Sequence, residues 1–286
     1  MDIKKSNSIK KSNQFIINLI KKDKPFILSR IRTESIIIQK NILNKPITNH
    51  LINILDNNAG IYVKNNKHIM KYINMSKKCY NNSSALICFD KLHVGMQNFF
   101  INKFKLRSID WHATEPFKLF QVNNITPWTH YLLGKKVLII NPFILSMKEQ
   151  LNNNFKMYKD KDIFLEGQEF VFYKCYQTSA GNHLHNSWVT TFNMMCDDIK
   201  KIDFDIALLS CGGYGEPLSF FIKNKLKKSA IYIGGHLQIY FGVGGKRWYK
   251  PHLIPHVEKE NGCKFIRPSG NEVTKNNKKV EGGCYW

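Results

Sequence analysis

Segment 205–248 restricts the fold of this chain more than any other part of the sequence. Residues 206–209 form a short, continuous apolar run, which is typical of a strand covered on both faces. A glycine-rich turn and a helical stretch follow, and Pro217 suits the first helical turn because its missing N–H would be unpaired there. A second apolar run, 230–233, ends at a glycine pair. We therefore expect a βαβ unit with glycines after the carboxyl ends of its strands, where open α/β sheets bind ligands.

Similar apolar runs recur near residues 26, 86, 137, 170, 206 and 230, and helical stretches separate them. This alternation is typical of an α/β protein with parallel strands. We therefore predict a Rossmann-like, mostly parallel sheet with flanking helices. The run near residue 86 ends at Asp90, so an acid follows the predicted second strand.

The two ends of the chain differ in character. Residues 1–23 are predicted to form a basic arm, frayed as far as Ser12, and a short helix. Residues 24–286 should form one α/β domain, or two lobes that divide near residue 130. The final residues, 281–286, include tyrosine and tryptophan, whose apolar area would be wasted in water. We therefore expect this segment to dock onto the domain.

The net charge of +22, from 43 Lys and Arg against 21 Asp and Glu, favours an anionic partner. The basic residues are spread along the chain, so the charge does not locate a site. No apolar run is long enough to span a bilayer and no signal-peptide pattern is visible, so we expect a cytoplasmic protein. The seven cysteines include no Cys-x-x-Cys pair, which argues against a zinc site and a disulfide framework.

Glycine at the ends of two strands has a chemical use, because a phosphate approaches backbone N–H groups closely only where no Cβ intervenes. The helix after the first turn adds unpaired N–H groups and a positive dipole end. The spacing matches neither the P-loop nor the dinucleotide fingerprint, and a turn that merely joins strand to helix is the alternative. A second glycine turn and the later Gly-Gly-Lys-Arg stretch favour a polyanion site. The residues expected to bind the ligand in this segment are Ser210, Gly212, Gly213, Tyr214, Gly215, Gly234, Gly235, Gln238, Lys246, Arg247 and Trp248.

Charged residues also follow the first predicted strand, where Arg30, Arg32 and Glu34 stand close together. Their position after a strand favours a role in the site, and the alternative is a salt bridge in a surface loop. Segment 110–117 offers further acids among aromatic residues, including Glu115, and here a packing loop is the alternative.

Several blocks of the sequence are similar to glycosyltransferases of the GT-D fold type and to related bacterial hypothetical proteins. The blocks with the most specific match are residues 204–218 and 233–248, with 281–286 at the end of the chain. Weaker blocks lie at residues 24–34, 127–150 and 179–188, so the resemblance covers most of the chain from residue 24 onward. It implies a nucleotide-sugar donor, a glycan or protein acceptor, and Mn²⁺ or Mg²⁺ beside the nucleotide-sugar.

One departure from that family concerns the acidic loop. GT-D enzymes carry a segment resembling Arg-x-Gly-Asp-Gly-Glu, whereas residues 30–34 here read Arg-Ile-Arg-Thr-Glu, one residue shorter and with a single acid. Arg32 stands near the place of the first carboxylate. Because a guanidinium can neutralise a diphosphate by itself, we expect that a divalent metal is not obligatory, and we assign no metal ligands.

The resemblance and the residues together predict glycosyl transfer from a nucleotide-sugar. In this hypothesis the glycines and basic residues hold the diphosphate, and Tyr214 or Trp248 stacks on the base or sugar. Glu34 is the candidate catalytic base and Glu115 a second one. One alternative is a basic nucleic-acid-binding protein that uses patch 246–249 to track a backbone and stack bases. A second is a nucleotide-binding pseudoenzyme without turnover, which the shortened acidic loop permits.

Overall fold

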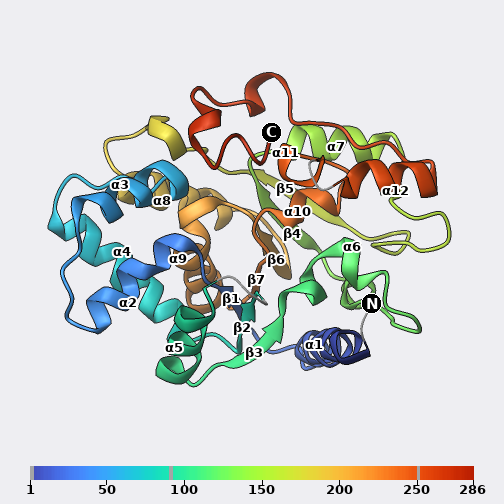
Figure 1. The fold of residues 1–286 in the computed structure, drawn as a ribbon, viewed down its shortest axis with the longest axis horizontal. Coiled ribbons are helices and arrows are strands. Elements are labelled where there is room, and N and C mark those ends of the chain that lie inside the picture. The colour runs from blue at the N-terminus through green and yellow to red at the C-terminus, as the bar shows by residue number, and fades with distance from the viewer. Residues whose placement is uncertain (1–2, 90–92, 250–251) are drawn as a thin grey trace.

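A computed structural model describes residues 3–89, 93–249 and 252–286 of the chain (Figure 1). Its centre is a seven-stranded sheet in the order β3-β2-β1-β7-β6-β4-β5, and every pair of neighbouring strands is parallel. The strands are β1 Ile27–Arg30, β2 Ala85–Cys88, β3 Arg107–Asp110, β4 Val137–Asn141, β5 Phe170–Lys174, β6 Ile206–Leu209 and β7 Ser229–Tyr232. The predicted Rossmann-like α/β fold is confirmed. Asp90, predicted to end the second strand, lies outside the described residues.

Helices cover both faces of the sheet (Figure 1). One face carries α2 Ile36–Ile42, α3 Asn49–Ala59, α4 Asn66–Asn81, α5 Val94–Phe104, α8 Trp188–Ile199 and α9 Gly215–Phe221, which continues as a π-helical turn, Ile222–Leu226. The other face carries α1 Ile3–Lys21, α6 Pro116–Leu119, α7 Ile144–Asn152, α10 His236–Ile239, α11 Lys246–Tyr249 and α12 Leu253–Asn261. In the part of the chain that the structure describes, no helix has the length and apolar character needed to cross a bilayer.

The apolar runs form strands because both of their faces are buried. In β4, Leu138 and Ile140 face the cluster around α4, α8 and α9, while Val137 and Ile139 face the cluster around α1, α7 and α12. Every residue of β4 and β6 is buried. This alternation across a sheet with two covered faces explains why these strands read as continuous apolar runs.

The sequence did not predict β3, which lies at the edge of the sheet and pairs only with β2. Arg107 and Ser108 in its first half are exposed, and only Ile109 and Asp110 are buried. An edge strand with so few buried positions has no apolar run to mark it. The first residue of segment 110–117, Asp110, is therefore the last residue of β3.

The helix near the N-terminus is longer than predicted, because the residues from Ile3 to Ser12, expected to be a frayed arm, belong to a single helix α1 that extends from Ile3 to Lys21. Its buried stripe combines isoleucines with Ser12 and Asn13. The Asn13 amide donates to the carbonyl oxygen of Thr126 at 2.8 Å and accepts from the N–H of Trp128 at 2.8 Å. Ser12 and Asn13 thus belong to the buried face of α1 although they are polar. A search for apolar residues at helical spacing therefore does not detect the first half of this helix.

The connections leave the carboxyl ends of the strands in opposite directions. The chain after β1 and β6 turns toward α2 and α9 on one face, whereas the chain after β4 and β7 turns toward α7 and α10 on the other. Loops that part in this way leave a crevice above the strands between them. The fold thus leaves a crevice over β1, β7, β6 and β4.

Packing of α1 predicts a clear contrast between two isoleucines of the same helix. Ile16 is 0 % exposed, so Ile16→Ala should lower the free energy of unfolding by about 2–5 kcal/mol through lost burial and a residual cavity. Ile3 is 77 % exposed and Ile3→Ala serves as the matched control, with an expected change within about 0.5 kcal/mol. Urea denaturation measures both, and equal effects would mean that α1 is not packed on the sheet.

Candidate functional site

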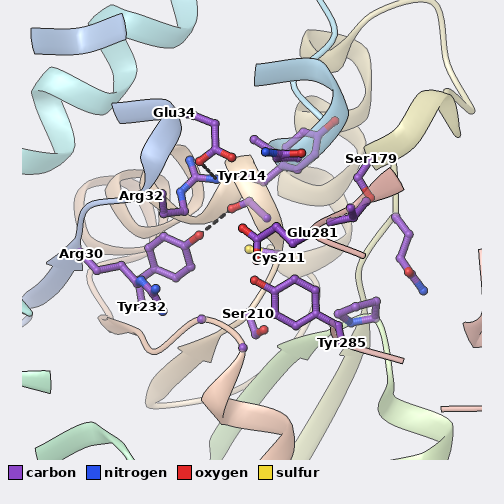
Figure 2. A pocket seen from close by; sticks show the side chains of 18 of the residues that line it. Arg30, Arg32, Glu34, Ser179, Ser210, Cys211, Tyr214, Tyr232, Glu281 and Tyr285 are labelled. Carbon is purple, nitrogen blue, oxygen red and sulfur yellow. Dashed lines mark hydrogen bonds and ion pairs between the residues drawn. The ribbon is translucent and has the colours of Figure 1, made fainter. Parts of the chain in front are cut away.

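A cavity of about 290 Å³ lies at the carboxyl ends of β1, β7, β6, β4 and β5 (Figure 2). It brings together segments that lie far apart in the sequence, from the loop after β1 to residues 280–286. The sequence-predicted residues that line it are Arg30, Arg32, Glu34, Ser210, Gly212, Tyr214, Gly234, Gly235, Gln238 and Arg247. Those that do not line it are Glu115, Gly213, Gly215, Lys246 and Trp248.

Arg32 is held by a carboxylate that sequence reasoning missed. Its Nη2 lies 3.2 Å from Oε2 of Glu216, which is 0 % exposed, and donates to the Tyr72 hydroxyl at 2.8 Å. Glu34 lies on the other side, with Oε2 3.9 Å from Nη1. Burial disfavours the charged guanidinium, yet the neighbouring carboxylates and tyrosines hold the pKa of Arg32 well above its usual range. Burial also raises the pKa of Glu216, and Arg32 opposes that rise.

Glu216 also helps to hold the loop after β1. The Tyr80 hydroxyl lies 3.3 Å from Oε1 of Glu216 and 3.3 Å from the carbonyl oxygen of Arg30. The sequence signal for this residue was present, because Glu216 directly follows the glycine turn in the first turn of α9. Its neighbours Gly215 and Pro217 were interpreted as features of a backbone turn. Nothing in the sequence indicated that Glu216 would be the buried partner of Arg32.

Arg30 differs from Arg32 in its partners. Its Nη1 donates to the carbonyl oxygen of Ile233 at 2.6 Å, and its guanidinium lies over the rings of Phe89 and Tyr232, 5.0 and 5.7 Å from their centroids. Nε is buried without a hydrogen-bond partner, and none of the ion pairs found among the described residues includes Arg30. Arg30 therefore brings a positive charge to the cavity wall that no described carboxylate neutralises.

The glycines of the site serve mainly to admit the protein's own side chains. A Cβ on Gly234, which has a φ of +73°, would collide with the Arg30 guanidinium. A Cβ on Gly213 would collide with Ile61, and one on Gly215 would meet the Tyr232 ring. Gly213 and Gly215 therefore face side chains of the protein, and neither lines the cavity.

The basic-aromatic patch 246–249 is occupied by contacts within the protein. Trp248 is 3 % exposed and packs beside His236 and Tyr285, with ring centroids 5.9 and 6.4 Å away. Lys246 Nζ donates to the carbonyl oxygen of Gly282 at 3.1 Å, and Arg247 pairs with Glu281. Trp248 therefore offers no open face for stacking on a base.

Tyr214 also has little free surface, although it lines the cavity. It is 1 % exposed, and its hydroxyl lies 3.2 Å from the carbonyl oxygen of Gly60 and 3.1 Å from Oγ1 of Thr178. These contacts make Tyr214 a part of the wall and leave no face for stacking.

Glu115 lies away from the cavity, where it caps the first turn of α6. Its carboxylate accepts from the N–H groups of Phe117 and Lys118 at 2.9 and 3.0 Å. Burial raises the pKa of Glu115 to about 7. Helix capping explains this acid without any contact to a ligand.

Residues 281–286 dock as expected, and they also complete the cavity. The carbonyl oxygen of Tyr285 accepts from Gln238 Nε2 at 3.2 Å, and the backbone N–H of Lys246 donates to the carbonyl oxygen of Trp286 at 3.0 Å. Glu281, Tyr285 and Trp286 line the cavity. Sequence reasoning expected this segment to dock but did not connect it with the site.

His236 is another lining residue that the sequence did not single out. Burial and the positive charges of Arg30 and Arg247 hold the pKa of His236 well below its usual range, so the imidazole is neutral. Its ring centroid lies 5.2 Å from that of Trp111. His236 thus adds a neutral hydrogen-bonding group beside Arg30.

The described residues do not offer a set of ligands that suits Mn²⁺ or Mg²⁺. Among them no group of three or more His, Cys, Asp or Glu side chains lies close enough together to hold a metal ion. Glu34, which lines the cavity, and Glu216, which is buried behind its wall, both face Arg32. A guanidinium stands where a cation shared by these acids would bind.

Comparisons of the chain with models of protein families, with curated proteins and with solved structures returned no match. The site therefore has to be understood from its own geometry.

The buried ion pair predicts non-additive effects on stability. Arg32→Met leaves Glu216 buried without its cation and should lower the free energy of unfolding by about 3–5 kcal/mol at neutral pH. The double variant Arg32→Met, Glu216→Gln should recover most of that loss, because the unpaired charge is gone. Lys228→Met, which breaks an exposed pair with Asp205, is the control and should cost less than about 1 kcal/mol. Additive losses in the double variant would contradict this description of the pair.

Proposed function

We propose that the protein is a glycosyltransferase that binds a nucleotide-sugar in this cavity and transfers the sugar to a glycan or protein acceptor. The observation that carries the proposal is Arg30, a guanidinium in the cavity wall without a described carboxylate partner, close in sequence to the buried acid Glu34. The sequence resemblance to GT-D enzymes agrees with this arrangement.

The position and size of the cavity support a ligand of this kind. Ligands of open α/β sheets bind at the carboxyl ends of the strands where the loops part, as they do over β1 and β7. The volume of about 290 Å³ is just below the range typical for small-molecule sites, roughly 300–1,000 Å³. A nucleotide-sugar would fill it and leave the acceptor to approach from outside.

The chemistry needs two tasks that these residues can perform. Arg30 neutralises the diphosphate as it leaves, through the donors that do not bond to Ile233. Glu34, oriented by Arg32 at 3.9 Å, takes the proton from the acceptor hydroxyl. The acceptor oxygen then forms a bond to the anomeric carbon, the bond from that carbon to the diphosphate oxygen breaks, and the nucleoside diphosphate departs with the electron pair.

A nucleotide-binding protein without turnover is the second candidate. The observation in its favour is that Arg32 lies between the two acids of the site, 3.2 Å from Glu216 and 3.9 Å from Glu34. In the alternative of nucleic-acid binding, patch 246–249 would have to be open, and Trp248 in it is buried.

Donor binding is tested by thermal denaturation with UDP-, GDP-, TDP- and CDP-sugars. A ligand that binds only the folded protein must raise the melting temperature, and Arg30→Met should remove that rise. Arg107→Met is the matched control, because this exposed arginine lies against Phe15 of α1 and outside the cavity. If no sugar nucleotide raises the melting temperature, with or without manganese, the proposal fails.

Catalysis is tested separately through Glu34. With a donor that binds, Glu34→Gln should lower the rate of nucleoside diphosphate release by about 100-fold or more while the donor affinity changes little. Wild-type protein that binds the donor and releases no nucleoside diphosphate with any acceptor would favour the second candidate.

A further inference from the structure

The cavity has two chemically different ends. Its charged side chains are Arg30, Arg32 and Glu34, which lie at or after the end of β1, and the paired Arg247 and Glu281. The lining residues that follow β4 and β5 are uncharged: Pro142, Phe143, Tyr176, Gln177, Thr178 and Ser179. A ligand that spans the cavity therefore meets positive charge over β1 and neutral groups over β4 and β5.

On this basis, and resting on the proposed function, we propose that the end of the cavity formed by Phe143, Gln177 and Trp286 binds the nucleobase of the donor. The sheet order β1-β7-β6-β4-β5 sets the distance. Neighbouring strands lie about 4.8 Å apart, so the backbone of Arg30 and the ends of β4 and β5 are separated by roughly 14–19 Å. The Arg30 guanidinium reaches Ile233 after β7, which shortens the span that the ligand has to bridge. An extended nucleoside diphosphate has its charge at one end and its base at the other, which matches this separation of chemistry.

The uncharged end of the cavity, formed by Phe143, Gln177 and Trp286, is held in place because Gln177 and Trp286 bond to the same carbonyl group. Gln177 Nε2 and Trp286 Nε1 both donate to the carbonyl oxygen of Glu272, at 3.0 and 2.9 Å. Phe143 supports the indole from the side, with ring centroids 5.9 Å apart in an edge-to-face arrangement. Gln177 and Trp286 are partly exposed and line the cavity, so both residues have surface available to a ligand.

Glu272 is acidic, but its carboxylate does not line the cavity. Its carboxylate accepts from the N–H of Leu145 at 2.7 Å and from the hydroxyl of Ser146 at 2.5 Å. The side chain is 1 % exposed and caps the first turn of α7. The first-turn N–H groups of α7 are thus already used by the protein and offer no site for a phosphate.

These groups suit a nucleobase better than a phosphate or a charged sugar. A base is flat and neutral and gains free energy by stacking on an aromatic side chain. Its ring N–H or amino groups can donate to Oε1 of Gln177, which has no hydrogen-bond partner among the described residues, while the amide nitrogen already bonds to Glu272. The donor would then lie with its base over β4 and β5, its diphosphate at Arg30 and its sugar toward Glu34.

The test compares nucleoside diphosphates with inorganic diphosphate, which has no base. Isothermal titration calorimetry would measure the binding of uridine, guanosine, thymidine and cytidine diphosphates and of inorganic diphosphate to wild type, Gln177→Met and Trp286→Leu. Both variants should weaken the nucleoside diphosphate that binds the wild type by about 10-fold or more. Their affinity for inorganic diphosphate should not change. Arg30→Met should weaken both kinds of ligand.

The outcomes distinguish a failure of the proposed base site from a failure of the proposed glycosyltransferase function. Nucleoside diphosphates that bind the wild type and both variants equally would overturn the base site and leave the proposed function standing. Equal losses for nucleoside diphosphate and inorganic diphosphate would also overturn it, because the variants would then disturb the whole cavity. If no nucleoside diphosphate binds the wild type, both proposals fall. Should Trp286→Leu lower the melting temperature, Gln177→Met alone decides, since its side chain is close to glutamine in size.

Discussion

The buried ion pair between Arg32 and Glu216 connects two of the chain segments that form the cavity and its supporting wall. Arg32 belongs to the loop after β1 and Glu216 to the first turn of α9, after β6. A carboxylate that is 0 % exposed is stable only while its partner is present. Tyr80 contacts Glu216 and the carbonyl oxygen of Arg30, so the same network also sets the start of that loop. The position of Glu34 in the cavity therefore depends on this pair.

The glycine turns lie at the cavity, but the close approaches that they allow are made by groups of the protein itself. Gly234 was expected to admit a phosphate, and in the structure it admits the Arg30 guanidinium, which then faces the cavity. Gly215 likewise gives room to the ring of Tyr232, whose hydroxyl donates to the carbonyl oxygen of Gly212 at 2.7 Å. A glycine in the sequence indicates that some group comes close to the backbone, but it does not indicate whether that group belongs to a ligand or to the protein.

Most of the sheet could be predicted, since the apolar runs of β4 and β6 are continuous and both faces are buried. The elements that escaped prediction have weak local patterns. β3 has only two buried residues at an edge of the sheet, and the buried face of α1 includes Ser12 and Asn13. Within the site, Arg30 and Glu34 were found because they lie at or after the end of a strand. Gln177 and His236 were not, because no local pattern marks an isolated polar residue.

The amino-acid sequence was sufficient for the α/β class, the strands with long apolar runs and the general region of the site, because periodicity and turn chemistry are local properties. Which charges meet is decided only when distant segments pack together. Arg32 and Glu216 are 184 residues apart, and Trp286 and Gln177 share the carbonyl oxygen of Glu272. Burial then determines the consequences, since it makes the Arg32 pair obligatory, while Arg30 has no carboxylate partner among the described residues. Ion pairing depends on the distance between charged groups and on their solvent exposure, and the linear sequence specifies neither directly.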